Sequence, residues 1–187
     1  MILGSCNGLL CLRYFGGKIV LWNMSIREYH WLPDTQMEFP GGFGSCEFAN
    51  YGFGYDSVNE DYKVVRLVQF LNKKEKEFKV YSLKDDVWRR SQDFPYYLCY
   101  KYAWGVLVNG ALHWAVTQTL ESEEKFVLAF GISMEVYGMV PLPEFSDRCF
   151  HLTVHVLGGC LCLLCHYFGV RVDVWVMRQY EVKESWG

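Results

Sequence analysis

The sequence feature that most restricts the fold is a hairpin pattern that recurs four times along the chain. Each unit has a glycine-centred turn, an apolar strand, a looser connection, a second apolar strand and a return with an aromatic residue. The units span residues 4–33, 51–95, 104–143 and 154–186. Their second strands are anchored, 45 to 59 residues apart, by Trp22, Tyr81, Phe130 and Trp175. That spacing suits a four-stranded unit.

The segment from Tyr51 to Arg66 shows the hairpin pattern most clearly. Gly52 and Gly54 remove side chains where neighbouring groups need a close approach. The residues from Asp56 to Asp61 supply turn-forming side chains, and an alternating strand follows from Tyr62. Two-residue turns that tolerate a positive φ are predicted in the same way at Asn7-Gly8, Asn109-Gly110 and Gly158-Gly159.

The composition favours strands, because 18% of the 187 residues are aromatic and 51% are hydrophobic. No long helical period interrupts the pattern. Since one unit cannot bury both of its faces alone, we predict a single all-β domain over residues 1–187, a β-propeller-like array of about four antiparallel meander units in a closed or an incomplete, open ring. The predicted core contains Leu9, Leu21, Trp22, Val64, Val80, Tyr81, Leu112, Trp114, Leu128, Phe130, Leu161, Val174 and Trp175.

Charge and hydropathy give no indication of a nucleic-acid or membrane partner. The net charge of −3 combines 18 basic with 21 acidic residues and no basic stripe. The longest apolar run, from Val154 to Cys165, is far shorter than the roughly 20 residues of a membrane-spanning helix. The start at Met1 has no secretory signal pattern, so we expect a cytoplasmic and/or nuclear protein whose eight cysteines are reduced.

The run from Cys162 to His166 matches the Cys-x-x-Cys-His pattern of covalent haem attachment. Its alternating apolar context predicts a buried strand instead. Zinc is disfavoured because Cys160 and Cys162 fall on one face of that strand and Cys165 on the other. We therefore predict no metal and no cofactor.

Catalytic motifs are also missing from the sequence. The histidines show no His-Glu-x-x-His spacing, and no serine sits in a Gly-x-Ser-x-Gly turn. His113 precedes Trp114 in a predicted strand, where a hydrogen-bonded structural imidazole is expected rather than a general base. We assign no catalytic residue and predict that the chain is not an enzyme.

Two linkers, residues 34–50 and 92–102, are predicted to cross a propeller face, and the charged run 73–77 to form a solvated loop tip. The second linker is dense in tyrosine, which combines apolar area with a polar tip and few rotatable bonds. One interpretation is that these tyrosines seal a gap between units two and three. The other is that they bind a partner, and the candidate partner-binding residues are Tyr96, Tyr97, Tyr100 and Tyr102.

The chain resembles the F-box-associated interaction domain of plant F-box proteins over nearly its whole length. The motifs that carry the resemblance occur in the family's order at residues 5–11, 21–24, 52–56, 61–65, 80–83, 109–114, 158–161 and 175–177. Examples are Ser-Cys-Asn-Gly-Leu-Leu-Cys in the first and Gly-Phe-Gly-Tyr-Asp in the third. Met24 departs from the family's usual proline, and Gly131 from its common acidic residue.

The resemblance implies a protein-interaction module similar to the substrate receptor of SCF-type ubiquitin ligases, which act in ubiquitin-dependent protein degradation. Its partner would be a protein substrate. The F-box helices that bind a Skp-type adaptor in the family have no counterpart here, so this chain alone is not expected to contact the adaptor. The alternative is a small-molecule or glycan-binding propeller with exposed aromatic rings.

Overall fold

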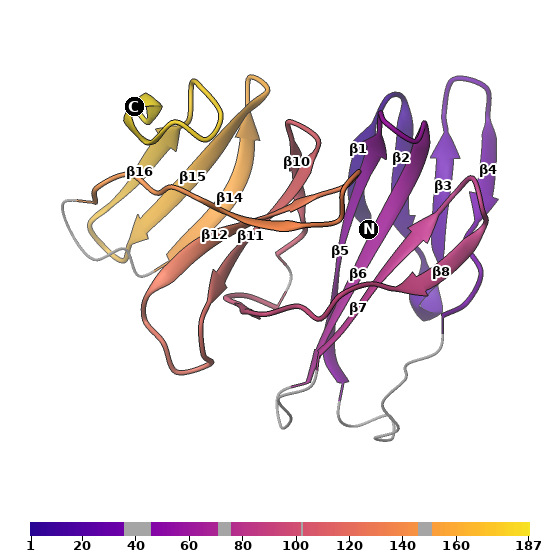
Figure 1. Cartoon of the computed structure of the whole chain (residues 1–187), viewed down its shortest axis with the longest axis horizontal. Helices are drawn as coiled ribbons and strands as arrows, with labels where there is room; N and C mark the ends of the chain where they lie inside the picture. The colour runs from indigo at the N-terminus through magenta and orange to yellow at the C-terminus, as the bar shows by residue number, and fades with distance from the viewer. Residues whose placement is uncertain (36–45, 71–75, 102, 146–150) are drawn as a thin grey trace.

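A computed structural model describes residues 1–35, 46–70, 76–101, 103–145 and 151–187 (Figure 1). These residues form strands and two 3₁₀ turns, η1 at Phe15–Gly17 and η2 at Lys183–Ser185. Neither turn is long or apolar enough to cross a membrane, and the described residues contain no other helix.

The strands form four antiparallel sheets, each built in chain order except for one added edge strand. Sheet 1 contains β1 (Ile2–Cys6), β2 (Leu9–Arg13), β3 (Ile19–Asn23) and β4 (Glu28–Trp31). Sheet 2 contains β5 (Cys46–Asp56), β6 (Asp61–Phe70), β7 (Lys76–Ser82) and β8 (Val87–Arg90). Sheet 3 contains β10 (Val106–Val108), β11 (Ala111–Thr117), β12 (Lys125–Gly131) and β13 (Tyr137–Val140), with β9 (Tyr97–Leu98) paired to β11. Sheet 4 contains β14 (His151–Leu157), β15 (Cys160–Tyr167) and β16 (Arg171–Val176).

The predicted two-residue hairpin turns are confirmed by their backbone. Asn7 and Gly8, which connect β1 to β2, have φ values of 47° and 81°. Asn109 and Gly110, which connect β10 to β11, have φ values of 49° and 73°. Both residues of each turn therefore lie in the left-handed region, as a turn that matches the twist of its strands requires.

The sheets stack in sequence, with an apolar core between each pair of neighbours. Strand β1 packs against β5, β5 against β10 and β11, and the last two against β14. One core, which includes Leu21 and Phe53, lies between sheets 1 and 2, and a second, which includes Leu67 and Phe130, lies between sheets 2 and 3. The third, which includes Val127 and Leu163, lies between sheets 3 and 4. The array of four antiparallel meander units confirms the predicted all-β, propeller-like class.

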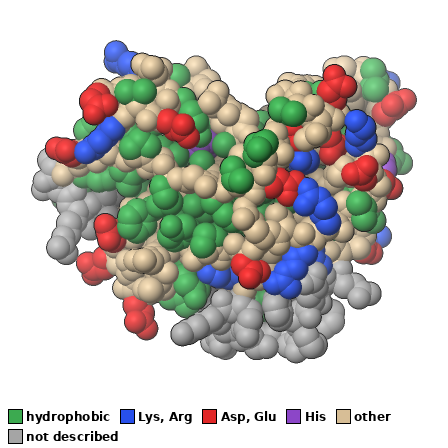
Figure 2. All heavy atoms as spheres, in the orientation of Figure 1, with side chains coloured by type: hydrophobic (Ala, Val, Ile, Leu, Met, Phe, Trp, Pro, Cys, Tyr) green, Lys and Arg blue, Asp and Glu red, His purple; other side chains and the backbone are tan. Residues whose placement is uncertain are grey.

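The array is open in this structure. Figure 1 shows sheets 1 and 4 at the two ends of the succession, and no apolar core joins them among the described residues. Figure 2 shows a notch in the upper outline of the molecule, between the half that holds sheets 1 and 2 and the half that holds sheets 3 and 4. Within the described ranges, each terminal sheet therefore has one face without a neighbouring sheet.

The glycines of β5 permit the close contact between sheets 2 and 3. A methyl group on Gly52 would lie 2.6 Å from Leu112 Cδ1, and one on Gly54 would lie 2.4 Å from Ile132 Cδ1. The prediction that these glycines serve a close approach is correct. The approaching groups come from sheet 3, which the sequence alone does not indicate.

Several predictions of burial and of boundaries need correction. Val174 is 50% exposed rather than part of the core, because it lies on the free face of sheet 4. Leu9 and Trp175 are half-buried at the margins of the cores, and Trp22 is half-buried on the face of sheet 1 that points away from sheet 2. The other members of the predicted core are buried.

The predicted linkers are shorter than expected. Residues 46–50 belong to β5, residues 97 and 98 form β9, and residues 76 and 77 belong to β7, where Glu77 is fully buried. The remainder of the charged run, residues 73–75, lies outside the described residues, as do residues 36–45 of the first linker.

We expect Gly52→Ala to destabilise the protein by about 1–3 kcal/mol, because the added methyl group would overpack the buried Leu112 side chain. The control is Gly138→Ala in β13, where no atom lies within 4 Å of the new methyl group. That variant should be neutral or slightly stabilising. Chemical denaturation of both variants checks this, and equal stabilities would contradict the role assigned to Gly52.

Candidate functional site

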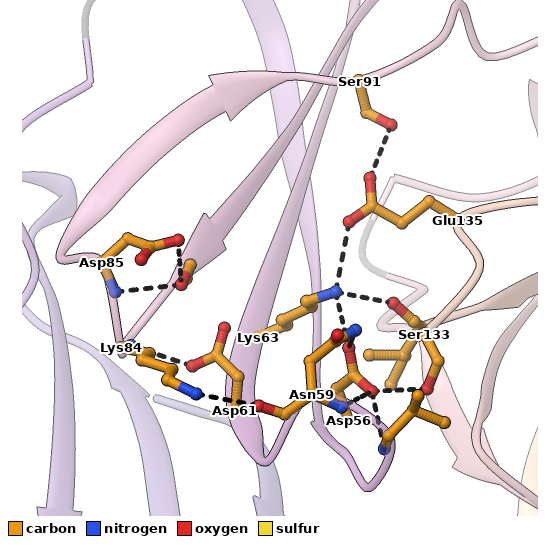
Figure 3. Close-up of polar contacts among 12 residues, drawn as sticks. Asp56, Asn59, Asp61, Lys63, Lys84, Asp85, Ser91, Ser133 and Glu135 are labelled. Carbon is orange, nitrogen blue, oxygen red and sulfur yellow. Dashed lines mark hydrogen bonds and ion pairs between the residues drawn. The ribbon is translucent and has the colours of Figure 1, made fainter.

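A buried polar network joins sheet 2 to sheet 3 at the end of the β5–β6 hairpin (Figure 3). Asp56, whose side chain is fully buried, accepts hydrogen bonds from the backbone N–H groups of Val58 and Asn59 at 3.0 and 3.1 Å. It also accepts from Asn59 Nδ2 at 2.7 Å and from Ser133 Oγ at 2.6 Å. The ammonium of Lys63 lies 2.8 Å from its second oxygen.

Lys63 connects this carboxylate to the turn between β12 and β13. Its Nζ donates to the carbonyl of Ile132 at 3.0 Å and to Glu135 Oε1 at 3.2 Å. Glu135 also pairs with Arg89 and accepts from Ser91 Oγ at 3.3 Å. Sheets 2 and 3 are thus joined by charges as well as by apolar packing.

The electrostatics of the network favour its ionised form. Burial alone would raise the pKa of Asp56, but hydrogen bonds from Asn59, Lys63 and Ser133 hold that pKa well below its ordinary value. The pKa of Glu135 is also lowered, because Arg89 and Lys63 outweigh the effect of burial. Among the described residues, no histidine belongs to this network. Ser133 donates to the Asp56 carboxylate, which also accepts a hydrogen bond from Asn59. The arrangement joins two sheets, and each of its two carboxylates is paired with a cation: Asp56 with Lys63, and Glu135 with Arg89.

A second polar cluster joins sheets 1 and 2. His30 Nε2 lies 3.1 Å from the hydroxyl of Tyr81 and 3.0 Å from Asp86 Oδ1, and Tyr81 donates to Asp86 at 2.6 Å. Burial and the Asp86 carboxylate raise the pKa of Tyr81 far above its ordinary value, while the Tyr81 hydroxyl and His30 lower the pKa of Asp86. The phenol therefore stays neutral and acts as a donor.

His113 forms a third connection, between β11 and the segment after β16. It is fully buried; Nδ1 lies 3.0 Å from the carbonyl of Val106, which only accepts, so Nε2 accepts from the Tyr180 hydroxyl at 2.7 Å. Burial lowers the pKa of His113 from 6.5 to about 4. This confirms the prediction of a hydrogen-bonded structural imidazole.

The tyrosine-rich segment lies across two sheet contacts. Tyr96 packs half-buried against the core between sheets 2 and 3, and its carbonyl accepts from Lys76 Nζ at 2.8 Å. The same ammonium lies 3.9 Å from the ring centroid of half-buried Tyr97, which pairs with Thr117 in β11.

Tyr100 packs against the core between sheets 3 and 4. Its ring stacks on His151, with 4.0 Å between centroids, and its hydroxyl accepts from the N–H of Leu152 at 2.9 Å. The fourth candidate, Tyr102, lies outside the described residues. The three described tyrosines are each half-buried. Binding of a partner by their exposed parts stays a prediction.

The cysteine motif lies in β15, as predicted. Cys165 belongs to the core between sheets 3 and 4, whereas Cys162 is on the opposite face of the strand. Burial raises the pKa of Cys11 and of Cys99 to about 12, so these thiols stay protonated. Over the part of the chain that the structure describes, no group of three or more His, Cys, Asp or Glu side chains is arranged to hold a metal ion.

Sequence reasoning did not identify the polar connections between sheets. A signal for Asp56 was present, since an acidic residue that opens a turn commonly accepts from the next backbone N–H groups. For Lys63 no signal exists, because a lysine in an alternating strand ordinarily points to solvent. Its burial follows from the ion pair with Asp56 and from the β12–β13 turn, where Ile132 and Glu135 lie 69 and 72 residues away along the chain.

We expect Asp56→Ala to lower the free energy of unfolding by about 3–5 kcal/mol, because it leaves Lys63 buried without its 2.8 Å partner. The matched control is Asp93→Ala, which removes an exposed ion pair with Arg90 and should cost less than about 1 kcal/mol. Denaturant titration of both variants measures the difference. A cost for Asp56→Ala as small as the control's would contradict the role assigned to the buried polar network.

The lowered pKa of His113 predicts that stability falls as the pH falls from about 6.5 to about 4. In that range the unfolded state binds a proton at this histidine and the folded state does not, so the loss reaches on the order of 3 kcal/mol. His113→Gln should flatten the profile. His155→Gln is the comparison: burial also lowers the pKa of His155, but by less, so this variant should flatten the profile less than His113→Gln does. A profile unchanged by His113→Gln would contradict the assignment.

Comparison with known proteins matches residues 2–187 to the F-box associated beta propeller domain. The chain is 35% identical to F-box protein CPR1 and 33% identical to the F-box/kelch-repeat protein At3g23880, both from Arabidopsis thaliana. Each alignment covers 99% of this chain and 50% of the relative. F-box protein At4g22390 of the same plant is 32% identical over the same shares. The chain spans about half the length of these relatives, and it belongs to the F-box associated β-propeller family.

Proposed function

We propose that this domain is the substrate-recognition part of an F-box protein and performs no catalysis itself. The observation that carries the proposal is the family match over residues 2–187, together with relatives named as F-box proteins. In such a protein the domain would select a protein substrate for an SCF-type ubiquitin ligase, in the cytoplasm and/or nucleus.

The polar groups of the domain support a scaffold rather than an active site. In the described residues, the buried acid and histidine considered above are engaged across the sheet contacts: Asp56 with Ser133 of the β12–β13 turn, and His113 with Tyr180 after β16. A catalytic site needs a nucleophile, a base and a group that orients the base, within reach of a substrate. The inter-sheet clusters instead hold neighbouring sheets in one relative position, which a recognition surface requires.

The proposal is tested with the purified chain as bait in plant extract, combined with chemical crosslinking and mass spectrometry. A Skp-type adaptor is added separately in a two-component assay. We expect the chain to crosslink to a small set of proteins and not to bind the adaptor. A fusion that places F-box helices before the chain should bind both. Adaptor binding by the chain alone, or failure to retain any protein, would contradict the proposal.

The tyrosine segment offers a specific test of where the substrate binds. We expect the double variant Tyr96→Ser and Tyr97→Ser to reduce substrate capture at least about tenfold, since half-buried tyrosines are frequent binding hot spots. Tyr14→Ser, at an exposed tyrosine remote from the segment in sequence, is the matched control. Tyr100→Ser should instead lower the melting temperature, because it removes a core ring and the acceptor of Leu152 N–H. Full capture by the double variant would exclude this segment as the recognition surface.

A further inference from the structure

The last strand of each sheet forms one of its edges, and one of these strands differs from the others. Charged side chains occur in β4, β8 and β16, namely Glu28, Arg89, Arg90, Arg171 and Asp173. Strand β13, with the sequence Tyr-Gly-Met-Val, has none. Charged side chains on an edge strand hinder its pairing with another strand. Of the strands that end the described sheets, only β13 therefore lacks this protection.

The edge of β16 shows how a short extended segment covers such an edge in this fold. Val176 and Gly187 exchange backbone hydrogen bonds at 3.0 and 3.2 Å, and Met177 bridges to Trp186. Trp186 Nε1 also donates to the carbonyl of Pro141, just past the end of β13, at 2.8 Å. Among the described residues, no strand pairs with the outer edge of β13 itself.

The unpaired edge of β13 presents backbone donors and acceptors. The N–H of Gly131 donates to the carbonyl of Val136 at 3.0 Å, so the alternation of the antiparallel ladder directs the backbone groups of Gly138 toward β12. The N–H and C=O groups of Tyr137 and Met139 point away from β12. Such outward groups are the ones that an added strand binds.

The surface beside this edge is apolar and has one open position. Met139 is 42% exposed, and Met134 and Val136, in the turn before the strand, are 78% and 56% exposed. Figure 2 shows hydrophobic side chains gathered on the half of the molecule that holds sheets 3 and 4. No atom lies within 4 Å of a methyl group placed on Gly138, so a large side chain of a neighbouring strand has room there. An aromatic residue opposite an edge glycine packs over the exposed backbone.

We propose that β13 binds an extended, uncharged segment of a partner protein as an additional strand, with an aromatic residue opposite Gly138 and an apolar residue on either side of it. The inference rests on the proposed function in one respect, since the segment would belong to the substrate. The tyrosine segment lies at the other edge of sheet 3, because β9 pairs with β11 on the side opposite β12. The two surfaces can therefore be altered separately.

The probe is a library of random octapeptides, selected for binding to the purified chain. We expect the selected peptides to share an uncharged apolar–aromatic–apolar pattern. Synthetic peptides with this pattern are then N-methylated at alternate residues, in two sets. One set removes the N–H donors that face β13 and should bind at least about tenfold more weakly. The other set modifies N–H groups that face solvent and should retain its affinity, measured by fluorescence anisotropy.

Met139→Pro tests the same contact by a change in the chain. Because the N–H of Met139 points away from β12, proline removes a donor for the peptide and no hydrogen bond of the β12–β13 ladder. We expect the peptide affinity to fall at least about tenfold. Tyr29→Pro, which removes an outward N–H from the edge strand β4, is the matched control and should bind the peptide normally. Thermal melts verify folding, and the methylated peptides give the result on the unaltered chain if a variant unfolds.

Three outcomes would overturn the proposal. The first is a library without enriched peptides. The second is equal binding of the two methylated sets, or of the folded Met139→Pro variant and the unaltered chain. The third is a selected peptide that does not compete with protein capture from plant extract, which would separate the edge from the substrate and leave the recognition role intact. Peptide binding at β13 by a chain that captures no protein would instead contradict the proposed function and support the edge site alone.

Discussion

The structure depends on how closely sheets 2 and 3 approach at strand β5. This strand contacts β1 on one side and β10 and β11 on the other, so its backbone lies against both neighbouring sheets. With Gly52 and Gly54 beside Leu112 and Ile132, the backbone of β5 lies almost directly against the core residues of sheet 3. A larger residue would move the sheets apart and would lengthen the contacts of Lys63 with the β12–β13 turn.

The buried polar groups between sheets act mainly through the free energy that is lost when a shift of the sheets separates these groups from their partners. A buried ion pair adds little net stability, but an unpaired buried charge is expensive. A displaced sheet would separate Lys63 from the β12–β13 turn, Asp56 from Ser133, or His113 from its partner after β16, so only one relative position satisfies all of them. Apolar packing between the sheets selects their relative position less strongly, because the hydrophobic effect is non-directional. Buried apolar area therefore holds the sheets together, and the polar clusters determine their relative position.

The sequence was sufficient for the fold class because strand alternation and turn residues are local signals. The turns at Asn7-Gly8 and Asn109-Gly110 follow from two residues each, and the core positions from period-two alternation. The burial of individual side chains and their polar partners could not be predicted, because both depend on which sheet packs against each strand. Val174 alternates like a core residue, yet no described sheet covers its face. The partners of Asp56 and His30 are likewise set by residues 77 and 51 positions away.

The conformation of the tyrosine segment depends both on local turn residues and on contacts with other sheets. The sequence alone therefore left two interpretations of this segment open. Local chemistry indicates a turn-rich loop after Pro95, and tertiary contacts convert part of it into β9. Tyr100 is held at ring and hydroxyl, and Tyr97 lies under Lys76, so the segment has little freedom to rearrange. A recognition surface at this position would be ordered before its partner arrives and would lose little conformational entropy on binding. In the proposed function, the fixed position of this segment between the joined sheets is the physical link between the fold and selective binding.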